Sequence, residues 1–289
     1  MKFVNITNDI AFRKIFGNEN KKNTLISFLN AVLNLTDDEA VKDVSIQNPY
    51  LLPKYSGGKT TIVDVKATDL KGNIFIVEMQ VAEAKDFDKR VLYYASQSYT
   101  DQIERGDLYA NLKPTFFIGI LNFDVTQNKN YLSRHRILDV ETNENIVKNL
   151  EFNFIELNKF KKNQQELTSI IDQWVYFIKN AEDLEVIPET ITDEGIKDAF
   201  IQADKHNWTK EELQEYNKVF MREQDERGRY QLAIERAEKN AELKGKIQGI
   251  NEGKIEGKIE VAKNLKINGI SMDIIILSTG LTKEEIDKL

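Results

Sequence analysis

The sequence of 289 residues contains no cysteine, and only two of its residues are histidine. The absence of cysteine excludes disulfides and thiolate zinc sites, and it is typical of proteins from a reducing compartment. His135 and His206 lie far apart in the chain, which argues against a zinc enzyme or a histidine-dependent triad. Any metal is therefore expected to be a hard cation, Mg²⁺ or Mn²⁺, held by carboxylate oxygens and water.

Long apolar runs are also missing, since the longest stretch, near residues 274–277, is far too short to span a membrane. The first residues carry charges throughout, so we expect no signal peptide, no membrane partner and a cytoplasmic protein. The net charge of -7 argues against a protein that coats nucleic acid nonspecifically. An enzyme acting on DNA stays compatible with that charge, because local patches govern phosphate contacts.

The most informative pattern is a predicted β-hairpin over residues 60–82. Its arms, 60–69 and 73–82, alternate apolar and polar side chains as half-buried strands do. Leu70-Lys71-Gly72 fits a three-residue loop, with Gly72 in the left-handed region. The loop fixes the register of the two arms.

Counting back from the loop places Asp64 opposite Glu78. Gln80 and Lys66 share their face, because side chains repeat every second residue. Two facing carboxylates repel each other unless a positive group lies between them, and a divalent metal is the simplest such group. The alternative is a solvated edge hairpin, on which scattered acidic residues are common.

An Asp followed, about fourteen residues later, by Glu-x-(Lys or Gln) on an adjacent strand resembles the active-site signature of the PD-(D/E)XK nucleases. With its flanking segments, the chain resembles the Rpn family of recombination-promoting nucleases, often labelled transposases. The resemblance extends from about Asn8 to the strand predicted at 115–123. The segments that carry it are NDIAFRKIFG (8–17), ISFLNAVLNL (26–35), VDVKATDLKGN leading to VEMQ (63–80) and RVLYYASQSYTDQIERGDLY (90–109).

The resemblance implies that Asp64 and Glu78 are the metal-binding carboxylates and that Gln80 stands at the place of the motif lysine. A lysine there orients water and offsets charge on the phosphate, whereas an amide only forms hydrogen bonds. Lys66, on the face of Asp64, is a candidate for supplying the missing charge. Asp9 is a candidate third catalytic acid, although an Asp at a helix start is also a common dipole partner.

The implied fold is α/β, with a restriction-endonuclease-like core of order α-β-β-β-α-β at 1–160. A helical extension (161–206) and a charged helical arm (207–289) are expected to follow. The elements predicted from the pattern are a helix capped by Asn8 or Thr7, a helix from Asn23 or Thr24 to Leu33, strands at 44–47, 115–123, 131–140 and 152–156, and a helix at 87–105 ended by Gly106.

Helix 87–105 places Arg90, Tyr94 and Gln97 on one face. Because this helix follows the acidic hairpin, Arg90 and Gln97 are candidates for binding the DNA phosphates. The alternative is an ordinary amphipathic helix that covers the sheet with its tyrosines half-buried.

The arm contains a short repeat that places Gly245, Gly249, Gly253 and Gly257 at four-residue steps. Such a stretch is a poor helix by itself, because each glycine costs about 1 kcal/mol relative to alanine. We expect it to be ordered by a second subunit, which makes the protein a homo-oligomer, or else to form a low-complexity hinge. The arm is expected to end in a short helix pair that plays a structural part.

These patterns predict a Mg²⁺- or Mn²⁺-dependent DNA endonuclease linked to recombination or mobile-element DNA. The alternative is a catalytically weak or inactive nuclease-fold protein that binds DNA or directs assembly. The absent motif lysine and the acidic net charge favour that alternative.

Overall fold

The computed structural model describes every residue except Met1, 52–60 and Ala84, and only the backbone of residues 223, 226 and 227. Thr60, the first residue of the predicted hairpin, lies outside the described residues. The α-helices and strands are α1 (Asp9–Phe16), α2 (Lys22–Leu33), β1 (Val44–Ile46), β2 (Tyr50–Leu51), β3 (Thr61–Ile62), β4 (Val65–Asp69), β5 (Ile74–Gln80), α3 (Phe87–Thr100), β6 (Thr115–Leu121), β7 (Leu132–Arg136), β8 (Leu150–Glu156), α4 (Ile170–Asn180), α5 (Glu194–Ala203), α6 (Lys210–Ile267), α7 (Met272–Thr279) and α8 (Lys283–Asp287).

The chain forms two compact units, Met1–Phe220 and Met221–Leu289. The division into 1–160, 161–206 and 207–289 stays a prediction. In the described part of the chain, no helix combines the length and apolarity needed to cross a membrane.

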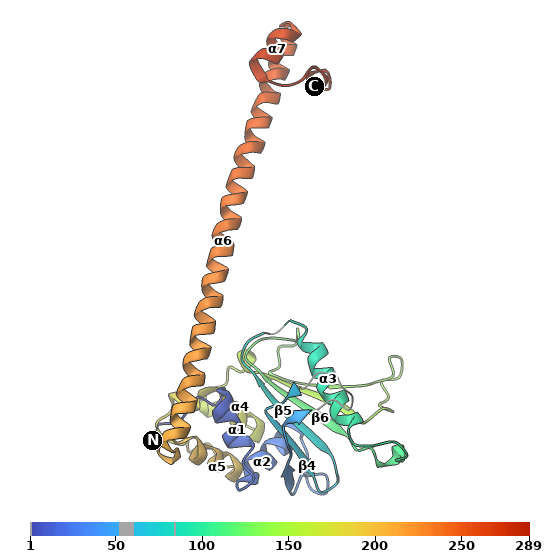
Figure 1. Ribbon diagram of the computed structural model, residues 1–289, viewed down its shortest axis with the longest axis vertical. Coiled ribbons are helices and arrows are strands. Elements are labelled where there is room, and N and C mark those ends of the chain that lie inside the picture. Colours follow the sequence, from blue (N-terminus) through green and yellow to red (C-terminus); the bar gives the residue numbers. More distant parts are fainter. Residues whose placement is uncertain (1, 52–60, 84) are drawn as a thin grey trace. The chain divides into compact units, whose positions relative to one another are not determined.

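The first unit is a mixed α/β structure built on a six-stranded sheet of order β1-β4-β5-β6-β8-β7 (Figure 1). Strands β4 and β5 form the predicted antiparallel hairpin from Val65 onward, whereas β5, β6 and β8 run parallel to one another. The first predicted arm is not continuous, because Thr61–Ile62 pairs with β2 and Asp64 lies in a bend before β4. Helix α3 connects β5 to β6, as a parallel crossover requires. Strand β5 therefore lies inside the sheet, with a partner on each side.

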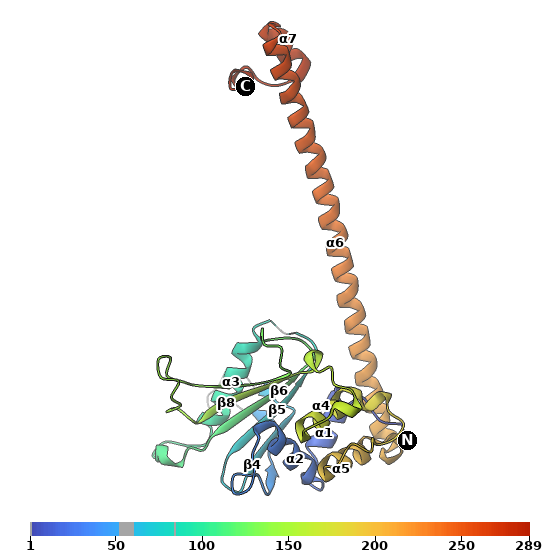
Figure 2. The same cartoon turned by 180° about the vertical axis from the view of Figure 1, so that it is seen from behind.

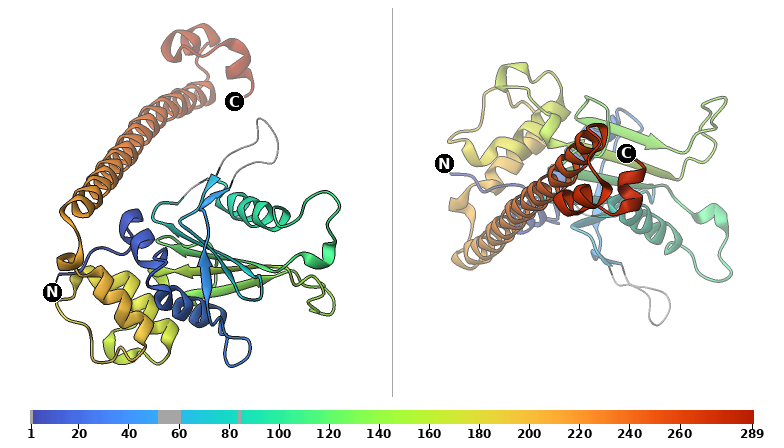
Figure 3. Two further views of the ribbon diagram at one scale, coloured as in Figure 1. Left: turned by 60° about the horizontal axis from the view of Figure 1, so that its bottom comes forward. Right: turned by 90° about the horizontal axis from the view of Figure 1, so that it is seen from above.

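Helices cover both faces of this sheet (Figures 1 and 2). One face packs against α1, α2, α4 and α5 through a large apolar cluster that includes Phe12, Phe28 and Trp174. The other face packs against α3 through a smaller cluster that includes Ile76 and Val91. The view in Figure 3 (left) shows α3 on the opposite side of the sheet from α2.

Local sequence explains where α1 begins and how it packs. The Asn8 side chain accepts hydrogen bonds from the backbone N–H groups of Ile10 and Ala11, which confirms Asn8 as the predicted N-cap. Phe12 and Phe16 recur at a four-residue spacing and are buried in the large cluster. The cap and this apolar stripe together fix the position of α1 against the sheet.

Three element predictions need correction. The arm at 73–82 is not half-buried: every residue of β5 before Gln80 is buried, because helices cover both faces. Helix α3 ends at Thr100, so Gly106, whose φ is 103°, lies in a later turn and does not cap it. The strand expected at 131–140 is limited to β7.

The second unit is helical. Helix α6 continues without a break through the glycine repeat, and α7 and α8 pack on its C-terminal end around Ala262, Ile275 and Ile286 (Figure 3). Beyond the adjoining residues and backbone of α6 itself, a Cβ added at any of the four repeat glycines would meet no described atom within 4 Å. The second subunit expected on this stripe stays a prediction.

Candidate active site

The register of the β4–β5 hairpin brings Asp64 and Glu78 together. Val65 pairs with Val77, so the next position places Asp64 across from Glu78 as predicted, and Gly72 has the predicted left-handed φ of 86°. The Asp64 N–H donates to Oε2 of Glu78 at 2.8 Å. The Met79 N–H donates to Oδ2 of Asp64 at 2.9 Å. Each carboxylate thus accepts a hydrogen bond from a backbone N–H of the opposite arm, at or next to the other acid.

Both acids are withdrawn from solvent. Glu78 is only 8% exposed, and the side chain of Asp64 is 7% exposed. Burial and the adjacent charge of Asp64 raise the pKa of Glu78 to about 8. Burial also raises the pKa of Asp64, while the hydrogen bond from Met79 and the ion pair with Arg13 oppose the shift. Burial and mutual repulsion therefore disfavour ionisation of both carboxylates, and a cation bound between them would favour the ionised pair.

Sequence reasoning missed one member of this site, Arg13 of α1. Its Nε and Nη2 both donate to Oδ1 of Asp64, at 3.0 and 2.8 Å. A signal was present, because Asp9 and Arg13 are four residues apart and so share one helix face. Without the fold, however, nothing linked that face to Asp64, which is 51 residues away.

Two residues predicted for the site lie near the carboxylates without contacting them. The charge of Asp9 adds to the rise in the pKa of Asp64, whereas the charge of Arg90 opposes the rise in the pKa of Glu78. Arg90 is held by its own helix: Nε donates to the Tyr94 hydroxyl at 3.3 Å, and the guanidinium lies over the Tyr94 ring. The pair is thus flanked by charged groups of α1 on one side and α3 on the other.

Three other predicted residues have different neighbours. The Gln80 amide donates to the Ala82 carbonyl at 3.0 Å. Burial lowers the pKa of Lys66, and the acidic group that opposes this shift is Asp101, after the end of α3. The buried Oε1 of Gln97 has no hydrogen-bond partner in the described part of the chain. The Gln80 amide therefore bonds its own backbone and not the acid pair, and the charge that acts on Lys66 comes from Asp101.

The donor set fits a hard divalent cation. Mg²⁺ is commonly bound by one or two carboxylates, with water and substrate phosphates as the remaining ligands. Oε1 of Glu78 accepts no hydrogen bond from the described residues and is available as such a ligand. No group of three acids or histidines converges within the described residues, so the protein contribution would be the Asp64–Glu78 pair.

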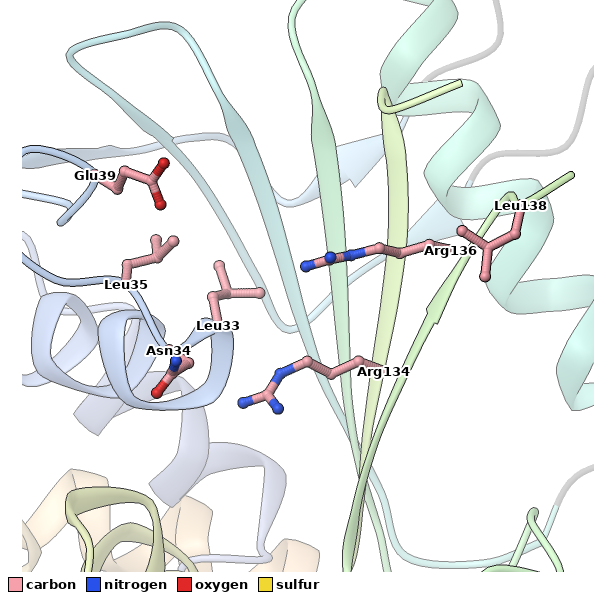
Figure 4. Close-up of a pocket in the computed structure, with 7 residues that line it drawn as sticks. All are labelled: Leu33, Asn34, Leu35, Glu39, Arg134, Arg136 and Leu138. Carbon is pink, nitrogen blue, oxygen red and sulfur yellow. The ribbon is translucent and has the colours of Figure 1, made fainter. Parts of the chain in front are cut away.

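A separate cavity of about 450 Å³ lies between the segment after α2 and strand β7 (Figure 4). Arg134 and Arg136 point into this space from β7, and Glu39 lies opposite (Figure 4). Arg134 donates to the Val32 carbonyl at 2.7 Å, and Arg136 is paired with Glu151 at 2.7 Å. Among the described residues that line this cavity, Glu39 is the one acid, so the cavity lacks a pair of carboxylates like that of the hairpin.

Comparisons with known proteins identify the family of the chain. Searches of curated proteins and of solved structures found no significant match. A family model described as PD-(D/E)XK nuclease family transposase matches residues 6–233, which include α1, the hairpin and α3. The chain belongs to this family of PD-(D/E)XK nuclease transposases.

Proposed function

We propose that the protein is a metal-dependent endonuclease that hydrolyses phosphodiester bonds in DNA. The observation that carries this proposal is the buried Asp64–Glu78 pair, linked across the hairpin and bordered by cationic side chains. Membership of the nuclease family supports it. The family description also supports a link to recombination or mobile-element DNA, although strand transfer would need groups beyond this pair.

In this proposal Asp64 and Glu78 hold Mg²⁺ or Mn²⁺. The ion, when bound, supplies Lewis-acid polarisation of the scissile phosphate and lowers the pKa of a coordinated water. Gln80 would orient the attacking water by hydrogen bonding after its amide leaves the Ala82 carbonyl. Asp9 would act through its charge on the neighbouring Asp64.

The remaining candidates would act on the substrate. Arg90, from α3, would hold a DNA phosphate beside Glu78, since a guanidinium matches phosphate geometry. Gln97, about two turns further along the same face of α3, would donate from its amide to the same strand of DNA. Lys66 would add positive charge to the hairpin face near Asp101. In the reaction, a water molecule gives up a proton to solvent as its oxygen bonds to phosphorus, the bridging P–O bond breaks, and the leaving oxygen takes up a proton from solvent.

Nicking of supercoiled plasmid in the presence of Mg²⁺ tests the proposal. Wild type should convert the plasmid to open circles, and Asp64→Ala should reduce the rate by at least about 100-fold. Glu144→Ala, which changes an exposed acid in a loop, is the matched control and should keep the wild-type rate. Equal cleavage by wild type and Asp64→Ala would reject the assignment.

A second candidate is a nuclease-fold protein that binds DNA or directs assembly without cleaving it. The Gln80 amide, which donates to its own backbone instead of to the acid pair, favours this candidate. Calorimetry with Mn²⁺ separates the two, because a competent site binds the ion through Asp64 and Glu78. A cytoplasmic location and pairing of two copies through the arm are part of the proposal. Sedimentation of the full chain against a 1–240 truncation tests the pairing.

A further inference from the structure

The acid pair needs a positive group that the motif lysine would ordinarily provide. Gln80 carries no charge, and the acid whose charge acts on Lys66 is Asp101 and not a member of the pair. Arg90 is engaged with Tyr94 through both a hydrogen bond and its ring. Among these candidates and Arg13, the cation in direct contact with a carboxylate of the pair is Arg13.

The contact made by Arg13 has a specific geometry. Nε and Nη2 both approach Oδ1 of Asp64, while Oδ2 is taken by the Met79 N–H. A divalent ion that binds Asp64 at Oδ1 needs the electron pairs that these two donors use. The ion and the guanidinium also repel each other at such short range. Binding of the ion and the Arg13–Asp64 contact are therefore in competition.

Arg13 is able to leave this contact without unfolding its helix. Its side chain is 46% exposed, so the guanidinium has solvent to move into. Its Nη1 donates to none of the described groups. The backbone of α1 stays anchored by the Asn8 cap and the buried Phe12. A released guanidinium would stay beside the metal-binding pair, where the scissile phosphate would lie.

We propose that Arg13 has two successive roles: it is the counter-ion of Asp64 before the metal binds, and it donates to the scissile phosphate afterwards. This inference rests on the proposed function. The ligand of Arg13 in its second role is a phosphodiester oxygen, which a planar guanidinium recognises well. Arg13 keeps its proton throughout and supplies hydrogen bonds and charge in place of the motif lysine. It is therefore a proposed catalytic residue of the cleavage step.

The two roles predict opposite effects of one substitution. Arg13→Ala removes the competitor of the ion, so Mn²⁺ affinity measured by calorimetry should rise by about tenfold. The same change removes a donor to the phosphate, so kcat for plasmid cleavage at saturating Mn²⁺ should fall by about 100-fold. Arg13→Lys should recover part of the lost kcat, because it restores the charge but not the planar fork. Arg105→Ala, at an exposed site, is the control and should leave Mn²⁺ affinity unchanged.

A merely structural Arg13 would give a different pattern, because loss of a residue that only holds the site together would weaken Mn²⁺ binding. Weaker or unchanged Mn²⁺ affinity in a folded Arg13→Ala protein, verified by circular dichroism, overturns the inference. Unchanged kcat in that variant overturns it equally. In both cases wild type still binds Mn²⁺ and cleaves DNA, so the proposed function survives. If wild type does neither, the proposed function fails and the role of Arg13 falls with it.

Discussion

Replacing Glu78 by Gln should remove one contribution to the pH dependence of the free energy of unfolding. The folded protein keeps the Glu78 proton up to a pKa of about 8, whereas the unfolded chain releases it near the ordinary value of 4.5. The folded state thus binds more protons between these limits, and the free energy of unfolding falls as pH rises through them. A pKa difference of one unit is worth about 1.4 kcal/mol, so the window from 4.5 to about 8 contributes on the order of 5 kcal/mol. The amide in Glu78→Gln does not ionise and avoids this loss.

The difference between the two proteins is measurable by urea denaturation at several pH values in EDTA. Tryptophan fluorescence reports on the first unit, because Trp174 and Trp208, the two tryptophans of the chain, are both buried there. Glu78→Gln should match wild type near pH 4.5 and exceed its stability by roughly 5 kcal/mol above pH 8. Mn²⁺ should stabilise wild type at high pH and leave Glu78→Gln unchanged.

The exposed Glu144 provides a matched control, because Glu144→Gln removes the same charge from a solvated loop and should follow the wild-type profile. Parallel profiles for wild type and Glu78→Gln from pH 4.5 to 9 would refute the reasoning. They would mean that Glu78 ionises alike in the folded and unfolded states, and so that its burial beside Asp64 does not restrain its charge.

Two further predictions concern α1 and the arm. Asn8→Ala removes the cap of α1 and should lower the free energy of unfolding by about 1–2 kcal/mol in urea, whereas Asn8→Asp should keep most of it; equal loss in both would contradict the capping role. Gly249→Ala and Gly253→Ala test the pairing proposed for the arm: if a second copy covers the glycine stripe, the added methyl groups should give faster hydrogen exchange of the α6 amides and a lower sedimenting mass. Slower exchange, from about 1 kcal/mol gained by each methyl group in open space, would contradict that pairing.

The hairpin was predictable because local rules determine its register. Gly72 adopts the left-handed conformation that the three-residue loop requires, and the side-chain period of two then places Asp64 across from Glu78. The cap of α1 at Asn8 was predictable for the same reason, since the bond that defines it spans only a few residues.

Features that depend on distant contacts were not predictable. Helix α3 ends at Thr100, before Gly106, and just beyond this end the side chain of Gln102 bonds both the N–H and the C=O of Lys113, which ties the chain to the start of β6. The contact of Arg13 with Asp64 likewise exists only once α1 lies against the sheet.

The most direct test of the central claim is diffraction from crystals soaked in Mn²⁺, with anomalous scattering used to locate the ion. We expect one or two peaks about 2–2.3 Å from carboxylate oxygens of both Asp64 and Glu78. The Arg13 guanidinium should then have left Oδ1 of Asp64. Peaks elsewhere in the protein, or an intact Arg13–Asp64 contact with no ion at the pair, would contradict the claim.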